Sequence, residues 1–193
     1  MLILETPRLS VERFTLDDAA FILRLLNDPS FILHVADKGV RTLADAEAYL
    51  SSGPLAHYER HGFGLWRVSE RGTGVPVGMC GLIKRDAFED VDVGYALLTE
   101  FSGQGYATEA ARAVVAYARD HLALRRLVAV VGMGNERSIR LLEKLGFGFE
   151  RMVHLSPDDE VGLYALHGEP MTMRPATAGD AVLDGDTTQK EKV

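Results

Sequence analysis

The chain has 193 residues, of which 47% are hydrophobic and 25% charged, a composition typical of one well-packed globular domain. Its formal net charge of −7 argues against a nucleic-acid partner, since no basic face dominates, and favours a surface that tolerates a cationic substrate. The sequence has no membrane-length apolar stretch, no signal peptide, and one cysteine, Cys80, which cannot form an internal disulfide. We therefore expect a cytoplasmic protein that binds neither nucleic acid nor membranes.

The first half of the chain predicts a strand, two helices and three more strands. Residues 8–14 alternate apolar and polar side chains, as a strand does. Asp17 precedes a helical pattern that runs to Leu26 and stops near Pro29, and Thr42 is a candidate N-cap for a second helix. The next two strands are separated by a glycine-bearing turn, which predicts an antiparallel hairpin. The three strands are expected over residues 62–68, 75–83 and 91–98.

The second half predicts two helices that alternate with strands. A helix is expected from near Thr108 to about Asp120, followed by a continuous apolar run at 126–131 that indicates a strand buried on both faces. A short helix over 138–145 ends at Gly146, which suits a left-handed C-terminal cap.

Two closing strands complete the predicted domain, over residues 147–152 and 161–167, with the polar stretch SPDDE between them. The order of elements predicts a mixed α/β fold with an antiparallel first half. Residues 169–193 are polar and lack periodicity. We therefore expect one domain over residues 1–168 and a C-terminal tail, mobile or docked, over 169–193.

The stretch FSGQGYATEA places two glycines directly before the long predicted helix. Without a Cβ, Gly103 and Gly105 allow a bulky group to approach the backbone, and the unpaired N–H groups of the first helical turn favour an anion. A seat for a diphosphate is one interpretation, and a tight turn without a ligand is the other. The stretch lacks the Gly-Lys-Ser/Thr ending of a Walker loop, and Thr108 stands where a dinucleotide fingerprint has glycine or alanine.

A second block, NERSIRLLEKLGF at residues 135–147, opens with Asn135 and Ser138 before an amphipathic helix. Together with ETPRLSVERFTLDDA, DVGYALL, SGQGYATEA and GLYAL, it resembles the GNAT (Gcn5-related) acetyltransferase superfamily. Within it, the sequence is most similar to the ribosomal-protein-alanine N-acetyltransferases and their relatives. The resemblance covers residues 5 to about 168. It implies an acyl-CoA N-acyltransferase fold, in which a largely antiparallel sheet contains a splayed strand pair and is flanked by helices.

The resemblance implies acetyl-CoA as acetyl donor, with no metal. Its pantetheine arm would lie in the splay, where it would bind the strand backbone, and Asn135 and Ser138 would contact it from the following helix. Its diphosphate would lie on the glycine loop. The implied binding residues are Ala96, Leu97 and Leu98 for the arm, and Gly103, Gln104, Gly105, Tyr106, Ala107 and Thr108 for the diphosphate.

The resemblance also implies direct transfer, in which an amine attacks the thioester without a covalent acyl-enzyme. A tyrosine that often serves as the acid in the superfamily is Leu142 here, so Ser138, or more weakly Tyr164, is the candidate for hydrogen-bonding the thiolate. Asp92 is the candidate base, and a solvent-facing strand residue is the alternative. Cys80 lies mid-strand, where a small buried residue is expected, so a cysteine hydrolase is disfavoured.

The sequence does not identify the acceptor of the acetyl group. A peptide or protein N-terminus and a small amine all fit the family, and SPDDE would suit a cationic acceptor. The loss of tyrosine at Leu142 keeps a degenerate acyl-CoA-binding sensor or assembly protein as the alternative to an enzyme. A nucleotide-dependent enzyme is a third hypothesis. The resemblance allows a monomer or a homodimer.

Overall fold

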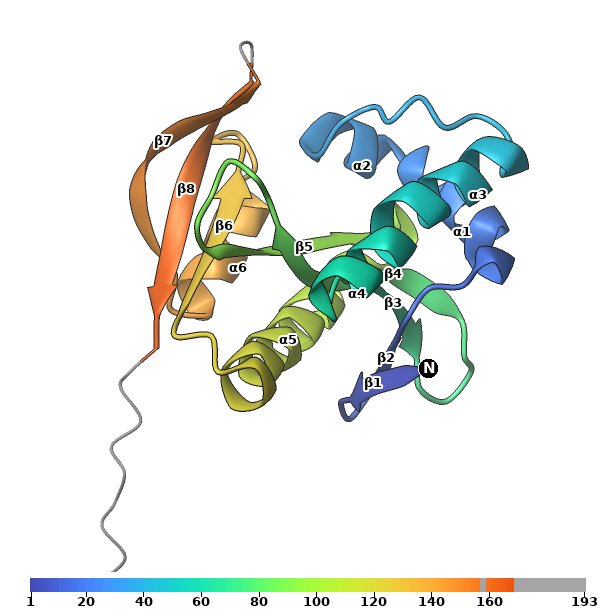
Figure 1. Ribbon diagram of the computed structural model, residues 1–193, viewed down its shortest axis with the longest axis horizontal. Coiled ribbons are helices and arrows are strands. Elements are labelled where there is room, and N and C mark those ends of the chain that lie inside the picture. The colour runs from blue at the N-terminus through green and yellow to red at the C-terminus, as the bar shows by residue number, and fades with distance from the viewer. Residues whose placement is uncertain (157–158, 169–193) are drawn as a thin grey trace, which may run out of the picture.

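The computed structural model describes residues 1–156 and 159–168, and within them the strands form one eight-stranded sheet (Figure 1). The strand order is β1-β2-β3-β4-β5-β6-β8-β7, and β5 and β6 are parallel while the other neighbours are antiparallel. The strands are β1 (Leu2–Glu5), β2 (Leu9–Glu12), β3 (Leu65–Glu70), β4 (Pro76–Lys84), β5 (Val91–Leu97), β6 (Arg126–Val131), β7 (Gly148–Ser156) and β8 (Asp159–His167). The predicted mixed α/β fold is confirmed.

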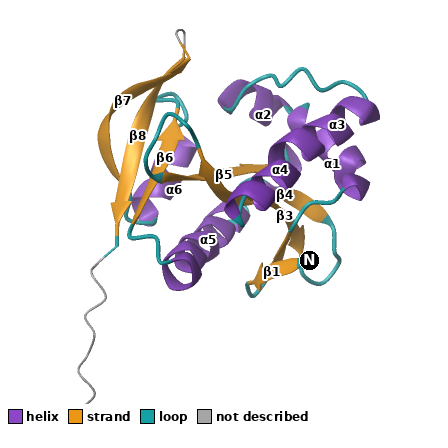
Figure 2. Cartoon of the chain, viewed as in Figure 1, coloured by secondary structure: helices purple, strands orange, loops and turns teal. Residues whose placement is uncertain are grey.

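Figure 2 shows α1, α2 and α3 gathered on one side of the molecule and α6 on the other, beside β6. The helices are α1 (Ala19–Leu26), α2 (Pro29–His34), α3 (Leu43–Leu50), α4 (Ala56–His61), α5 (Tyr106–Leu122) and α6 (Glu136–Lys144). Short 3-10 turns, η1 (Leu16–Asp18) and η3 (Thr99–Phe101), precede α1 and α5, and a π-helical segment, η2 (Ser51–Leu55), joins α3 to α4. No helix in these two described ranges is long and apolar enough to cross a membrane.

The helices pack on two hydrophobic clusters of the sheet. On β4, Cys80 packs into the cluster that includes α5 and α6, whereas the preceding residue, Met79, packs into the cluster that includes α1 and α3. Consecutive strand side chains point to opposite faces of a sheet, so the two clusters lie on opposite faces of β4. The sheet is thus covered on both sides at its centre.

Before β3 the prediction gave one strand and two helices, whereas the structure has two strands and four helices. Residues 2–5 form β1, which the sequence analysis missed, and the strand expected over 8–14 is limited to β2. Pro29 does not end the helical region but begins α2, because proline suits the first helical position and Asp28 accepts a hydrogen bond from Ser30 N–H as N-cap. Thr42 is the N-cap of α3, as predicted.

The later elements match the prediction closely. The β3–β4 pair is antiparallel and β6 has the predicted bounds. Helix α5 begins at Tyr106, two residues before the predicted start, and Gly146 ends α6 with φ of 90°. Strands β7 and β8 are longer than expected and take up the ends of SPDDE. The predicted tail, residues 169–193, lies outside the described residues.

The splay between β5 and β6 is the feature that shapes the centre of the molecule. The two strands pair at Val91↔Leu127 and at Asp92↔Val128, and their pairing in the described chain ends there. Both strands nevertheless continue, β5 to Leu97 and β6 to Val131. The splayed strand pair that the family resemblance implied is confirmed.

Gly81 is required where β4 pairs with the start of β3. A Cβ added at Gly81 would lie 2.1 Å from the carbonyl oxygen of Gly64 and 2.8 Å from Leu65 Cα, both of which belong to the backbone. We expect Gly81→Ala to lower the free energy of unfolding by about 3 kcal/mol, since overpacked sites lose about that much. Urea denaturation measures this, and Gly72→Ala, where a Cβ meets open space, is the matched control. Equal midpoints for the two variants would contradict the prediction.

Candidate functional site

The glycine loop before α5 presents unpaired amide groups to solvent. Gly103 and Gly105 have φ angles of 80° and 83°, and residues 103–105 are exposed. The first intrahelical hydrogen bond runs from Glu109 N–H to the Gly105 carbonyl, at 3.0 Å. The N–H groups of Tyr106, Ala107 and Thr108 therefore have no carbonyl to bind inside the helix, and they carry the positive end of its dipole.

The space beside Gly103, at the start of this loop, is open. A Cβ added at Gly103 would meet no described atom within 4 Å, and one added at Gly105 would lie 3.4 Å from Arg8 Nη2. No side chain of the described residues plugs the corner beside Gly103. The loop therefore has the donors, the dipole and the room that a phosphate group requires.

Arg8 clamps this loop to the start of the sheet, a role that the sequence analysis missed. Its Nη1 donates to the Gln104 carbonyl at 3.0 Å, and its Nε donates to Glu109 Oε2 at 2.7 Å. The guanidinium also lies 4.7 Å from the centre of the Tyr106 ring. Arg8 thus contacts the loop and the first turn of α5 together.

Glu109 forms the other half of this clamp, and both of its carboxylate oxygens accept hydrogen bonds there. Its Oε1 accepts hydrogen bonds from Thr6 Oγ1 at 2.6 Å and from Arg8 N–H at 3.0 Å. Partial burial alone would raise the pKa of Glu109, but the bonds from Thr6 and Arg8 outweigh it and lower that pKa. A signal was available in the sequence, since Thr6 and Arg8 belong to the ETPRL segment that carries the family resemblance.

The open edge of β5 consists of the backbone groups that do not hydrogen-bond to β4. Leu98 N–H donates to the Val77 carbonyl and Leu98 C=O accepts from Phe101 N–H, each at 3.0 Å. The Ala96 carbonyl faces Gly78 on β4. Because backbone groups alternate in direction along a strand, those of Leu97 point away from β4, into the splay. Of the three residues predicted to bind the pantetheine arm, Leu97 has backbone groups at the open edge.

A hydrogen-bonded pair, Tyr95 and Ser138, bridges the splay from β5 to α6. The Tyr95 hydroxyl lies 2.6 Å from Ser138 Oγ, and either oxygen can be the donor. Burial raises the pKa of Tyr95 to about 12, so the phenol is protonated at neutral pH. Ser138 was predicted from the sequence, whereas Tyr95 was not, because nothing in the sequence places the two residues together.

Asn135 caps α6 from the same turn. Its Oδ1 accepts a hydrogen bond from Ser138 N–H at 3.1 Å, which is the ordinary role of asparagine at an N-cap. Its Nδ2 group makes no hydrogen bond to the part of the chain that the structure describes. The cap therefore holds Ser138 in the first turn of α6 through the Oδ1 of Asn135.

Asp92, the predicted base, lies at the closed end of the splay. It is 1% exposed, and its Oδ2 accepts from Arg85 Nε at 2.5 Å. Burial raises the pKa of Asp92, and the charge of Arg85 offsets this only in part. These contacts place Asp92 where β5 and β6 last pair and favour a structural role for its carboxylate. A solvent-facing strand residue, the alternative considered from the sequence, is excluded.

The remaining candidates are core residues. Tyr164 is 4% exposed on β8 and packs edge-on against Phe149, with ring centres 5.6 Å apart. Leu142, at the position of the family tyrosine, is buried in the cluster under α6. Burial raises the pKa of the Cys80 thiol to about 12, so Cys80 is a poor nucleophile.

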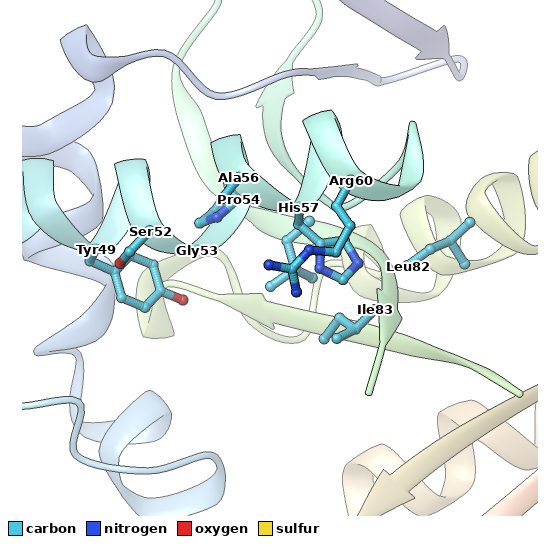
Figure 3. Close-up of a pocket in the computed structure, with 10 residues that line it drawn as sticks. Tyr49, Ser52, Gly53, Pro54, Ala56, His57, Arg60, Leu82 and Ile83 are labelled. Carbon is cyan, nitrogen blue, oxygen red and sulfur yellow. The ribbon is translucent and has the colours of Figure 1, made fainter. Parts of the chain in front are cut away.

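A cavity of about 200 Å³ lies on the β4 side of β5, away from β6, between the helical segment α3–η2–α4 and β4 (Figure 3). Its walls include Leu65 of β3 and Ile83 of β4. A Cβ added at Gly94 would lie 3.0 Å from Ile83 Cδ1 and 3.3 Å from Leu65 Cδ2. These two side chains therefore lie over Gly94 of β5, two residues after the pairing with β6 ends.

Comparison with known proteins identifies the family. Residues 8–148 match the model of the Acetyltransferase (GNAT) domain. An uncharacterized N-acetyltransferase of Bacillus subtilis, YoaA, is 29% identical over 75% of this chain and 82% of its own length.

Solved acetyltransferases share the fold. A crystal structure of an acetyltransferase from Agrobacterium tumefaciens superposes with a TM-score of 0.72 at 24% identity, covering 85% of this chain and 93% of its own. RimL, a ribosomal L7/L12 alpha-N-protein acetyltransferase solved with coenzyme A, superposes with a TM-score of 0.74 at 15% identity over 87% and 98% of the two chains.

The Asp92–Arg85 ion pair at the closed end of the splay is expected to stabilise the fold. We expect Asp92→Asn to lower the free energy of unfolding by about 2 kcal/mol, less than a fully buried pair loses because Arg85 is partly exposed. Thermal unfolding measures this, with the exposed Asp86→Asn as control. An activity loss of roughly 100-fold at unchanged stability would instead identify Asp92 as the base.

Proposed function

The chain belongs to the GNAT acetyltransferase family, and we propose that it transfers acetyl from acetyl-CoA directly to a primary amine. The observation that carries this proposal is the open splay between β5 and β6, with the exposed amides of the glycine loop at one end. In this proposal the diphosphate lies on the N–H groups of residues 104–108, where Gly103 and Gly105 leave room. The pantetheine arm bonds to the backbone of Leu97 as an added strand would.

Acetyl-CoA supplies an activated thioester, and the transfer balances without a further reactant. The amine nitrogen forms the new N–C bond while the C–S bond breaks, and the bonding pair stays on sulfur. The amine loses one proton and the thiolate gains one. The products are therefore an acetylated amine and the free thiol of CoA.

Ser138 is the residue that we propose to hydrogen-bond the departing thiolate. Its hydroxyl is held beside the splay by two neighbours, since Asn135 caps its backbone and Tyr95 binds its Oγ. The Tyr95 phenol retains its proton at neutral pH, so it can donate to Ser138 Oγ while Ser138 donates onward. Tyr95 acts here as a positioning residue for Ser138.

Solvent water is the acceptor that we propose for the amine proton. Asp92 is buried and paired with Arg85, which makes its carboxylate inaccessible to an incoming amine. His57, beside the cavity, already accepts Lys84 N–H at its Nε2, 3.1 Å away. A water path needs no further side chain.

The loop's role is tested by Gly105→Val and acetyl-CoA titration. We expect the wild-type protein to bind acetyl-CoA at micromolar concentrations, and the variant to bind it roughly tenfold or more weakly, because the new side chain obstructs the diphosphate seat. Gly74→Val is the matched control, since Gly74 has a similar φ of 72° and lies in open space away from the loop. Circular dichroism verifies folding. Unchanged affinity in Gly105→Val would contradict the proposed seat, and no binding by the wild type would remove the function.

The thiolate contact is tested by Ser138→Ala in a thiol-release assay. We expect kcat to fall by about 100-fold, the scale of a lost proton-transfer group, with little change in the Kd of acetyl-CoA. Tyr95→Phe should give a smaller loss in kcat, because Ser138 remains. A kcat unaffected by Ser138→Ala would contradict this role. Bound acetyl-CoA without thiol release for any amine would favour the sensor alternative.

A further inference from the structure

The cavity beneath α3–η2–α4 carries a charge pattern that points to its ligand. Ten residues line it, namely Tyr49, Ser52, Gly53, Pro54, Ala56, His57, Arg60, Leu65, Leu82 and Ile83. Arg60 is the cation of this set, and none of these described lining residues is a carboxylate. Arg60 is exposed, and its guanidinium makes no ion pair with any residue in the described ranges.

Hydrogen-bond donors line one side of the cavity, and apolar side chains form its floor. Figure 3 shows the Tyr49 hydroxyl and the Arg60 guanidinium pointing toward one another across the space below the helices. Ser52 Oγ is directed elsewhere, because it donates to the Ala48 carbonyl at 2.8 Å. The floor consists of Leu65, Leu82 and Ile83. A ligand that fits must accept hydrogen bonds at one end and present an apolar part to the floor.

His57 strengthens this donor character. Its Nε2 accepts the backbone N–H of Lys84, so the neutral ring carries its proton on Nδ1. Partial burial, then the nearby His61 and Arg60, lower the pKa of His57, so the ring is neutral at neutral pH. A neutral His57 neither pairs with the Arg60 guanidinium nor adds a second positive charge beside it.

The size and position of the cavity restrict the ligand further. Its volume of about 200 Å³ is below the roughly 300–1,000 Å³ of sites for drug-sized molecules, and suits a molecule of amino-acid size. The floor side chains Leu65 and Ile83 lie over Gly94 of β5, two residues past its last pairing with β6. A ligand anchored at Arg60 can thus extend an amine toward β5, where the splay has opened.

We propose that this cavity is the acceptor subsite, and that it selects a small primary amine bearing a carboxylate, which Arg60 and Tyr49 bind while the apolar part lies on Leu65, Leu82 and Ile83. This inference rests on the proposed function and adds the acceptor's chemical class. It departs from the cationic acceptor suggested by SPDDE. Asp158 lies outside the described residues, and Glu160 is exposed beside His154, with Oε1 and Nε2 4.0 Å apart.

Matched acceptor pairs test the carboxylate directly. Leucine is compared with isopentylamine and phenylalanine with phenethylamine, at constant acetyl-CoA, together with a short alanine-initiated peptide amide. We expect kcat/KM for thiol release to be at least about tenfold higher for the carboxylate-bearing member of each pair, because a charge-assisted bond to guanidinium is lost in the other. The peptide amide, which lacks the carboxylate, should react more slowly than the amino acids.

Arg60→Gln identifies the residue responsible. We expect this variant to lose the preference for the carboxylate, with kcat/KM falling about tenfold or more for the amino acids and little for the amines. Its Kd for acetyl-CoA should not change. Arg119→Gln, which removes an exposed arginine paired with Asp120 on α5, is the matched control and should keep the preference.

The outcomes separate this inference from the proposed function. Equal use of both members of each pair, faster reaction of the peptide amide, or a preference that survives Arg60→Gln would overturn the inference while the acetyltransferase assignment stands. Acetyl-CoA binding without thiol release from any of these amines would also overturn it. Failure of the wild-type protein to bind acetyl-CoA would instead remove the proposed function itself.

Discussion

The separation of β5 from β6 after Asp92 is the constraint on which the rest of the site depends. Two parallel strands that stop pairing while both continue leave backbone donors and acceptors unmatched, a costly arrangement in a sheet interior unless something else binds them. Leu97 carries such groups at the edge of β5. An extended ligand arm with amide groups of its own can hydrogen-bond to these groups as a strand would, so the opening is suited to bind such an arm.

Two contacts between distant parts of the chain hold the splay and its loop in place. At the loop, Arg8 and Glu109 join the start of β2 to the first turn of α5, so the glycine backbone is supported from outside. Across the gap, Tyr95 and Ser138 join β5 to α6. The exposed amides and the hydroxyl group thus belong to a rigid frame, and a ligand need not order them on binding.

The local features of this site could be predicted from the sequence, whereas those that depend on contacts between distant residues could not. The glycines before α5 and the glycine that ends α6 were predicted, because positive φ angles have strong residue preferences. The Tyr95–Ser138 bond and the Arg8 clamp were not, since they join residues 43 and 101 positions apart. Pro29 misled because proline begins a helix as readily as it ends one.

A crystal structure of the protein with coenzyme A tests the central claim most directly. The account predicts that the diphosphate oxygens accept hydrogen bonds from the amides between positions 104 and 108, with the pantetheine arm bonded to Leu97 and the sulfur near Ser138. A coenzyme bound elsewhere on the surface, or a splay that closes with β5 and β6 paired along their full lengths, would contradict it.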